Sequence, residues 1–383
     1  MGFMGYPRAD GRVGVRNHVV AMSSVSCANA VVEHIGRALP EVKTVTHTEG
    51  CGRGPRDVSV TLRTLANVAA HPNVAGVLLV GLGCEVIQAE LIASRVGEGK
   101  RLEWIGIQQS GGSPKTVARG VEVARDLLEE AARSERRECG FEHLTLAMEC
   151  GGSDAFSGLT ANPSVGFVAD WLVEEGGSVI LSEVTEFLGT ESIVAERGAN
   201  GEVRQKLLKL LEQQKETVKR NLGPLAHTVI APGNQAGGLS SIQEKSLGCI
   251  RKGGSSRIQE VLDYAEPPSM KGLCVMNTPG SDIFSITGMI AGGAQIVLFT
   301  TGRGSPAGSP IAPVVKVASN TRLFEWMPDD MDFDAGRIVA GMSLEECGTE
   351  LVELVKRVAG GEPTAPERTE TELFAIHTVG PAF

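Results

Sequence analysis

Short apolar runs alternate with longer amphipathic stretches along the first third of the chain. The runs predict strands at residues 18–25, 42–46, 74–80 and 102–107, and the stretches predict helices at 28–39, 58–70, 86–96 and 116–136. Residues 5–16, rich in glycine and arginine, predict an ordered loop before the first strand. Strands that alternate with helices of this length are typical of a parallel, doubly wound sheet.

The same alternation resumes after residue 142. It predicts strands at 143–148, 178–182, 273–276, 295–300 and 314–317, and helices at 164–174, 202–221, 241–250, 256–264, 283–291 and 344–359. Residues 360–372 are rich in Pro, Glu and Thr and predict a poorly packed tail. We therefore expect an α/β fold of two doubly wound, mostly parallel-sheet halves. The N-terminal α/β domain would occupy residues 1–142, the C-terminal α/β domain 143–360, and the tail 361–383.

Composition narrows the class of protein. An apolar share of 42% and a charged share of 21% over 383 residues are ordinary for a soluble protein with a sizeable core. A net charge of −10 and an aromatic share of 4% argue against a nucleic-acid partner. The sequence has no apolar run long enough to span a bilayer and no signal peptide at its start, so we expect a cytoplasmic location and no membrane association. In that reducing compartment the eight cysteines would be free thiols.

Polar, glycine-rich segments follow the predicted strands one after another. They occupy residues 46–54, 81–85, 108–115, 149–154, 277–282 and 300–305. The carboxyl ends of parallel strands meet at one edge of the sheet, and ligands bind there in such folds. We therefore expect a shared site that collects Cys51, Cys84 and Cys150, with His47, Glu49, Glu85, Glu149 and Arg303 nearby.

Three cysteines in glycine-rich loops suggest a metal site. Three thiolates and one open iron position would suit a [4Fe-4S] cluster, whereas His47, a carboxylate and fewer thiols would suit a mononuclear Fe2+ or another divalent ion. No cysteine spacing matches a CxxC pattern, so both possibilities stay open. Cys274 lies in an apolar run typical of the core and Cys249 nearly does, while Cys27 is ambiguous.

Other polar side chains in these loops suit catalysis or carboxylate binding. His47, beside a thiol and an acid, is a candidate general base or ligand. Asp154 lies in a GSDxFS pattern that recurs at 280–285, so it is either a helix cap or a side chain that touches substrate. Ser153 lies at the same glycine-rich helix start, where backbone amides can bind an anion, and arginine forks suit carboxylates. The candidate substrate-binding residues are Arg12, Arg16, Ser153 and Arg303.

Several long motifs, taken together, resemble one known family. They are GYPRADGRVGVRN (5–17), GCG (50–52), GLGCE (81–85), ECGGSDAFSGLTANP (149–163), GNQAGGLSSIQEKSLG (233–248), NTPG (277–280) and FTTGRGS (299–305). In this order they resemble the altronate and galactarate dehydratases, and the large subunit of a two-subunit sulfolactate sulfo-lyase resembles the same family. The motif at 233–248 contains Lys245, which joins His47 and Asp154 as a catalytic candidate.

The resemblance implies a lyase that dehydrates a 2,3-dihydroxy acid to a 2-keto-3-deoxy acid and requires iron or another divalent metal. Elimination needs a base at C2 and assistance to the leaving hydroxyl, because the proton is weakly acidic and hydroxide leaves poorly. Arginine and helix-start amides would hold the carboxylate. The metal ligands would include Cys51, Cys84 and Cys150.

One departure from the family concerns the start of the chain. The sugar-acid dehydratases carry a small β-rich domain ahead of the motif at 5–17, and this chain begins almost at that motif. We therefore expect a separate small β-domain subunit, an oligomer and a small hydroxy-acid substrate. The loop THTEGCG at 46–52 favours a sugar acid over sulfolactate. Elimination of sulfite from a small hydroxy acid is one alternative, and a non-catalytic iron- or anion-binding subunit is another.

Overall fold

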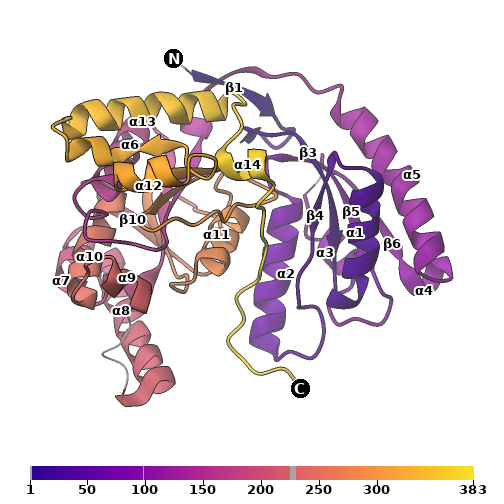
Figure 1. Cartoon of the computed structure of the whole chain (residues 1–383). Helices are drawn as coiled ribbons and strands as arrows, with labels where there is room; N and C mark the ends of the chain where they lie inside the picture. The colour runs from indigo at the N-terminus through magenta and orange to yellow at the C-terminus, as the bar shows by residue number, and fades with distance from the viewer. Residues whose placement is uncertain (1, 98, 225–229) are drawn as a thin grey trace.

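Helices and sheets alternate in five layers across the molecule (Figure 1). The computed structural model describes residues 2–97, 99–224 and 230–383. A four-stranded sheet in the N-terminal half has the order β4-β3-β5-β6, and a seven-stranded sheet in the C-terminal half has the order β10-β11-β9-β8-β12-β13-β14. All strand pairs within both sheets are parallel, which confirms the predicted α/β class.

The elements of the N-terminal half are β1 (Gly2–Pro7), β2 (Val13–Gly14), β3 (His18–Ser23), α1 (Asn29–Ala38), β4 (Val42–Val45), α2 (Pro55–Ala69), β5 (Val74–Gly81), α3 (Ala89–Ala93), β6 (Arg101–Gly106), α4 (Ile107–Ser110), α5 (Ser113–Ala131) and β7 (Arg137–Gly140). Helices α1 and α5 cover one face of this sheet, and α2 and α3 cover the other. Strands β2, β1 and β7 form a small antiparallel sheet.

The elements of the C-terminal half are β8 (Thr145–Cys150), α6 (Ala161–Glu174), β9 (Ser178–Leu181), α7 (Glu191–Glu196), α8 (Gly201–Leu222), α9 (Pro232–Ala236), α10 (Ile242–Cys249), β10 (Ile258–Leu262), β11 (Gly272–Met276), α11 (Asp282–Ala291), β12 (Ile296–Thr301), β13 (Val314–Ala318), α12 (Thr321–Trp326), β14 (Phe333–Asp334), α13 (Leu344–Ala359) and α14 (Ala365–Thr369). Helices α6 and α13 pack together on one face of the seven-stranded sheet. Helix α11 lies on the other face, against α2 of the N-terminal half (Figure 1). No described helix combines the length and the apolar character that a membrane span requires.

The middle layer joins the two sheets into one core. Leu65 and Val68 of α2 belong to the same buried cluster as Ile286 and Met289 of α11. The cluster also contains residues of β3 and β5 from one sheet and of β8 and β12 from the other. Because this apolar surface is shared, separation of the halves would expose it to water.

Four expectations from the sequence were wrong. The helix predicted at 256–264 is strand β10, whose Ile258, Val261 and Leu262 have helical spacing but pair with β11 through an irregular register. The predicted loop at 5–16 contains β2 and the end of β1, which pair with each other. The helix predicted at 86–96 shortens to α3. The tail is packed: α14 begins with a capping box, and Ala365 is fully buried.

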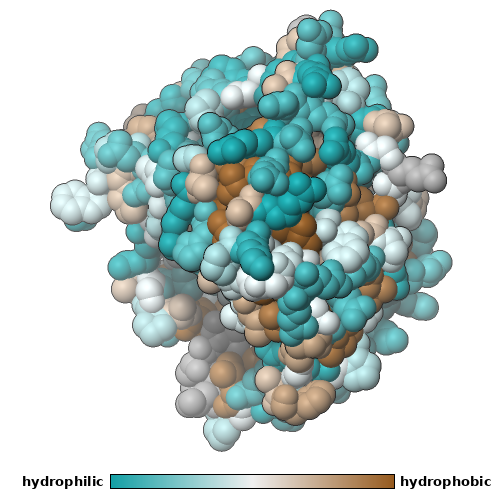
Figure 2. Space-filling model, turned by 90° about the vertical axis from the view of Figure 1, so that its right-hand side faces the viewer, coloured by the Kyte–Doolittle hydropathy of each residue, from teal (hydrophilic) through white to brown (hydrophobic). Residues whose placement is uncertain are grey.

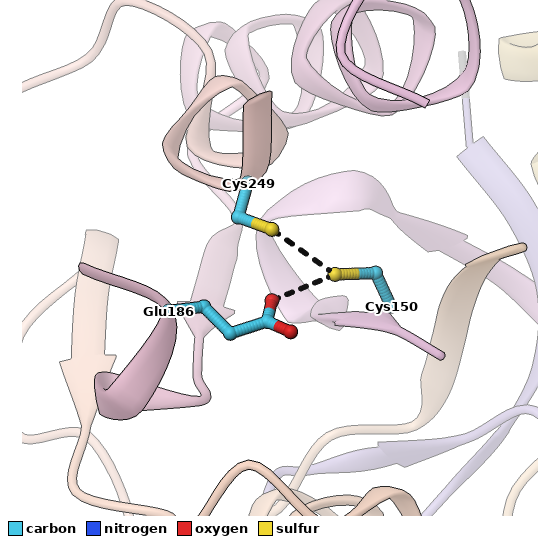
Figure 3. A group of neighbouring side chains, drawn as sticks. All are labelled: Cys150, Glu186 and Cys249. Atoms are coloured by element: carbon cyan, nitrogen blue, oxygen red, sulfur yellow. Dashed lines mark hydrogen bonds between the residues drawn. The ribbon is translucent and has the colours of Figure 1, made fainter. Parts of the chain in front are cut away.

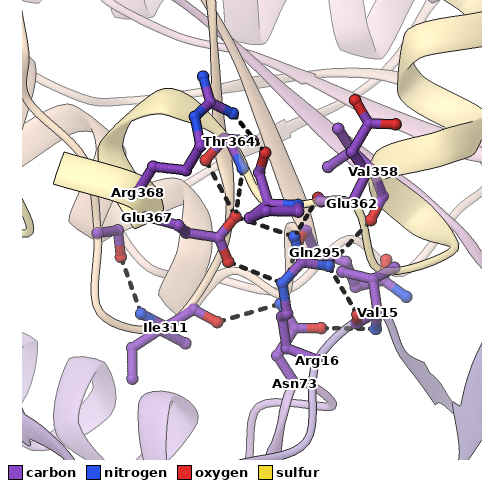
Figure 4. Close-up of polar contacts among 12 residues, drawn as sticks. Val15, Arg16, Asn73, Gln295, Ile311, Val358, Glu362, Thr364, Glu367 and Arg368 are labelled. Carbon is purple, nitrogen blue, oxygen red and sulfur yellow. Dashed lines mark hydrogen bonds and ion pairs between the residues drawn. The ribbon is translucent and has the colours of Figure 1, made fainter. Parts of the chain in front are cut away.

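Arg16 connects the two ends of the chain (Figure 4). Its Nε and Nη2 donate to the two carboxylate oxygens of Glu367 at 2.7 and 2.9 Å. Its remaining N–H groups reach the carbonyl oxygens of Val15, Val358 and Glu362 at 2.8–2.9 Å. The guanidinium is thus fully used by protein acceptors, so Arg16 has a structural role rather than the expected substrate-binding one.

The last residues extend the same connection along the N-terminal half. The carboxylate of Asp57, at the start of α2, accepts the backbone N–H groups of Val379 and Gly380 at 3.0 and 2.8 Å. The N–H of Phe383 donates to the carbonyl of Gly52 at 3.1 Å. The segment after α14 therefore runs from the C-terminal half onto the loop that contains Cys51 (Figure 1).

The outer side of the N-terminal half, where α5 lies, is mostly hydrophilic (Figure 2). Apolar side chains show between the polar ones on this side. Strand β6 forms the edge of the four-stranded sheet, and its Trp104 is 39% exposed. Most of the remaining β6 side chains are partly buried.

Candidate active site

The seven-stranded sheet changes its winding direction between β8 and β12. The chain leaves β8 through α6 to reach β9 on one side, and it leaves β11 through α11 to reach β12 on the other side of β8. Helices α6 and α11 lie on opposite faces, so the carboxyl ends of β8 and β12 border a crevice. The loops after these two strands are GGSD at 151–154 and GRGS at 302–305.

Glycine allows these two loops to approach each other. The N–H of Gly151 donates to the carbonyl of Thr300, and the N–H of Gly302 donates to the carbonyl of Gly152, both at 3.1 Å. A Cβ atom on Gly151 would clash with the carboxylate of Asp282, and one on Gly302 would clash with Asp154. The glycines of ECGGSD and TTGRGS therefore fix the shape of the crevice.

Asp154 ties this edge of the sheet together. Its Oδ1 accepts hydrogen bonds from the N–H and Oγ of Ser157 at 2.9 and 2.8 Å and from Ser319 Oγ at 2.7 Å. Its Oδ2 accepts from Asn320 Nδ2 at 3.0 Å. With four donors already bound, Asp154 holds the turn at 154–157 and links it to the residues after β13. It is not the expected helix cap, because α6 begins only at Ala161.

Cys150, Cys249 and Glu186 meet beneath the crevice (Figure 3). Cys150 ends β8, Cys249 ends α10, and Glu186 lies in the turn after β9. The Cys150 thiol donates to Glu186 Oε2 at 2.8 Å and lies 3.4 Å from the sulfur of Cys249. All three side chains are buried, and their ligand atoms lie within 4.8 Å of one another.

Two lysines balance the charge of this group. Lys252 is fully buried and its Nζ lies 2.9 Å from Cys150 Sγ and 2.8 Å from Glu183 Oε2. Lys245 reaches Glu186 Oε1 at 2.5 Å and is 15% exposed. Burial by itself would raise the pKa of Glu186, but Lys245 and Lys252 outweigh it and lower the pKa to about 2. Burial raises the pKa of Cys150 well above its usual range, so Cys150 is a thiol at neutral pH.

A second group of acids, Glu149, Glu183 and Asp282, lies at the same edge, and their ligand oxygens are also within 4.8 Å of one another. Glu149 Oε2 accepts hydrogen bonds from Ser285 Oγ at 2.7 Å and Ser182 Oγ at 3.1 Å. Burial, and next the charge of Glu183, raise the pKa of Glu149 well above its usual range.

We call Cys150, Cys249 and Glu186 together the thiol group. A cavity of about 450 Å³ opens over it. Its lining includes Ser153, Asp154, Lys245, Cys249 and Arg251. The Ser153 hydroxyl is buried and has no hydrogen-bond partner within the described part of the chain. A buried hydroxyl and a lysine that line one cavity are suited to an anionic or hydroxylated ligand. The structure thus brings together Ser153, Asp154 and Lys245 of the expected site, with Cys150 directly below.

The expected residues of the N-terminal half do not line this cavity. His47 is buried, its Nδ1 accepts the N–H of Glu49 at 3.1 Å, and its Nε2 lies 2.8 Å from the carbonyl of Ser23. Both ring nitrogens are therefore used. Cys51 and Cys84 are exposed in loops at the carboxyl edge of the smaller sheet, and neither belongs to the groups close enough to share one ion with Cys150 in the described residues.

The two other candidate arginines, Arg12 and Arg303, lie in different halves of the molecule. Arg12 is about half exposed and pairs with Asp10 at 2.6 Å and the carbonyl of Ala70 at 2.7 Å. It lines a cavity of about 260 Å³ with Arg8 and Lys100, in the N-terminal half. Arg303 is exposed on the loop after β12, next to Gly152, and so remains at the edge of the crevice.

Sequence reasoning missed Cys249, Glu183, Glu186 and Lys252. Cys249 nearly resembled a core cysteine from the sequence, yet its sulfur lies 3.4 Å from that of Cys150. Glu183 has a φ of +62°, in the left-handed region, and its side chain accepts the N–H of Cys150 at 2.9 Å. The available signal was the acid-rich segment SEVTE directly after a predicted strand.

Known protein families and relatives match nearly the whole chain. Residues 141–382 match the family described as D-galactarate/altronate dehydratase, C-terminal, and residues 5–132 match D-galactarate dehydratase/altronate hydrolase, second domain. Altronate dehydratase of Bacillus subtilis is 36% identical over 99% of this chain and 78% of its own length. Galactarate dehydratase (L-threo-forming) of Escherichia coli is 35% identical over 98% of this chain and 75% of its own length. The (2R)-sulfolactate sulfo-lyase subunit beta of Chromohalobacter salexigens is 33% identical over 98% and 96%.

Proposed function

The chain belongs to the D-galactarate/altronate dehydratase family and is a lyase, and we propose that it removes water from a sugar acid such as altronate or galactarate. The observation that carries the proposal is the 36% identity with an altronate dehydratase over 99% of the chain. In this reaction a base takes the proton from C2, the C3 hydroxyl leaves as water after it gains a proton, and the enol becomes a 2-keto-3-deoxy acid. Atoms and electrons balance without a redox partner.

The cavity beside β8 supplies the groups that such a substrate needs. Burial alone would lower the pKa of Lys245, but the neighbouring Glu186 outweighs burial and raises it. Lys245 therefore carries a positive charge at neutral pH, which suits it to hold a carboxylate or to donate a proton to the leaving hydroxyl, not to act as the base. Ser153 Oγ, free of protein partners in the described residues, can bind a substrate hydroxyl or carboxylate oxygen.

Iron or another divalent metal is part of the proposal. When bound, such an ion would supply a Lewis acid for departure of the C3 hydroxyl. The residues fit a metal, since two groups of ligand atoms, in which only Asp282 is not fully buried, lie at the carboxyl edge of the seven-stranded sheet. One group has two thiols and a carboxylate, and the other has three carboxylates.

Carbon–sulfur bond cleavage is the second candidate function. The relative that acts on (2R)-sulfolactate is 33% identical over 377 residues and is itself named as a subunit, which also supports a separate small subunit as partner of this chain. The two eliminations share the C2 proton and differ in the leaving group, sulfite in place of water.

The experiment is incubation of the purified protein, under anaerobic conditions with added Fe2+, with hexonates, hexarates and sulfolactate. Each reaction is run with and without a candidate small subunit. We expect a 2-keto-3-deoxy acid from one or more sugar acids and no sulfite. Release of sulfite from sulfolactate alone would establish the second candidate. Failure of all substrates under both conditions would refute both. Lys245→Met should lose turnover in protein that circular dichroism shows to be folded, and Lys206→Met on the exposed face of α8 is the matched control.

A further inference from the structure

Three acidic side chains converge where β8, β9 and α11 meet. Glu149 lies on β8, Glu183 follows β9, and Asp282 begins α11. Their ligand oxygens all lie within 4.8 Å of one another, so one ion can contact all three. Two of the three side chains, Glu149 and Glu183, are almost fully buried.

Glu149 has an oxygen without a partner. Its Oε2 accepts two serine hydroxyls, whereas Oε1 is buried and has no hydrogen-bond donor among the described residues. Buried carboxylate oxygens normally have donors, because a bare one loses its water and gains nothing in return. An ion bound by the three acids would supply the missing partner.

The charge around the acids is also unbalanced. Lys252 is the ammonium that contacts them directly, through Glu183 at 2.8 Å. Lys316 is buried nearby, but its Nζ lies 3.4 Å from the centre of the Phe299 ring and makes no hydrogen bond in the described part of the chain. When all three acids are ionised, as ligands of an ion are, one contacting ammonium leaves two negative charges, which a divalent cation would neutralise.

The neighbouring thiol group is the competing site, and its environment is different. Lys252 lies 2.9 Å from Cys150 Sγ and Lys245 lies 2.5 Å from Glu186 Oε1. Lys252 also lies 2.8 Å from Glu183 of the acid group, so the difference is Lys245, a second ammonium at the thiol group that repels a cation there. Thiols also favour soft ions, whereas carboxylates favour Mg2+, Mn2+ and Fe2+.

Asp282 gives the acids a route to solvent. It lies on the wall of a cavity of about 720 Å³ between the loops at 280–283 and 305–307 and the C-terminal segment at 370–373. An ion can therefore enter from this side without passing through the thiol group.

We propose that Glu149, Glu183 and Asp282, and not the thiol group, hold the divalent cation of this protein. The role of the ion in elimination rests on the proposed function, but the site does not. Its ligands come from three different elements at the strand ends, so the ion would also fix β8, β9 and α11 relative to one another.

The test is Mn2+ binding to the full chain without substrate, measured by electron paramagnetic resonance of the free ion. Asp282→Asn and Glu149→Gln keep side-chain size and remove charge, and each should weaken binding more than roughly 100-fold, since even residues behind the ligands change affinity 10–100-fold. Cys249→Ser is the matched control in the thiol group and should bind Mn2+ like the unmodified protein. Circular dichroism melting checks that each variant is folded.

Co2+ gives a second measurement that needs no variant. Carboxylate ligands give only weak absorption, whereas thiolate ligands give an intense near-ultraviolet charge-transfer band, so we expect no such band in the Co2+-loaded protein. An intense band would overturn the proposal, and so would loss of Mn2+ binding in Cys249→Ser with retention in Asp282→Asn, or failure of the unmodified protein to bind Mn2+. Because substrate is absent, a failed dehydratase assay leaves these results unaffected.

Discussion

Replacement of Arg16 by methionine tests whether this residue connects the chain ends or binds substrate. The side chain of Arg16 is 9% exposed and that of Glu367 is 14% exposed, so the substitution leaves a nearly buried carboxylate without its partner. Breaking such a pair costs about 3–5 kcal/mol. An unfolding entropy of about 2.1 cal/mol/K per residue gives roughly 0.8 kcal/mol/K for this chain, so Tm should fall by about 4–6 °C.

Differential scanning calorimetry measures the effect, with Arg12→Met as the matched control. Arg12 also forms an ion pair, but its side chain is 47% exposed, and exposed pairs contribute about 0–1 kcal/mol. The control should therefore melt within about 1 °C of the unmodified protein. A folded Arg16→Met protein with unchanged Tm and a raised KM would refute the structural role and return Arg16 to the substrate site.

The Arg16 effect should also depend on pH. Burial would raise the pKa of Glu367, but the Arg16 guanidinium outweighs burial and holds the pKa below its ordinary value of 4.5. A group with a lowered pKa in the folded state stabilises the protein above the unfolded pKa, and this stability is lost as pH falls through the folded pKa. The difference in unfolding free energy between the two proteins should therefore be constant above about pH 5.5 and shrink below about pH 4.5. A difference that does not change with pH would contradict this account.

Three further predictions concern the crevice. The stabilisation that Glu186 gains from Lys245 should be lost as pH falls from 4.5 towards about 2. The difference in unfolding free energy between the unmodified protein and Glu186→Gln should therefore narrow over that range, and a constant difference in urea titrations would contradict this. Lys252→Met leaves Glu183 without its ammonium and should lower the unfolding free energy by about 3–5 kcal/mol, and a loss below about 1 kcal/mol would show that the pair is not needed. Arg303→Lys keeps the positive charge but loses the paired N–H donors of the guanidinium, so KM should rise at unchanged Tm. An unchanged KM would exclude Arg303 from carboxylate binding.

The parallel sheets were predictable because both of their signals are local. Apolar runs such as 74–80 are buried on both faces and need no knowledge of distant residues, and the same holds for the glycine-rich turns after them. The helix predicted at 256–264 failed because tertiary pairing with β11 overrides helical spacing at Ile258 and Leu262.

The site was only partly predictable for a similar reason. Position at a strand end identified Cys150 and Ser153, but the partners of Cys150 come from 36 to 102 residues further along the chain. Arg16 shows the same limit, because sequence alone does not distinguish an arginine that binds a ligand from one that binds a glutamate 351 residues away. Sequence therefore indicated which loops lie at the strand ends, and folding decided which side chains meet there.

The contacts between the chain ends have a consequence for biosynthesis. Arg16 and Asp57 leave the ribosome more than 300 residues before their partners at Glu367 and Gly380. Until those partners are made, the nascent N-terminal half holds a guanidinium and a carboxylate that only water can satisfy, and α2 lacks the apolar cover of α11. Its final structure is then acquired only after Gly380 has been made, and until that point this half depends most on chaperones.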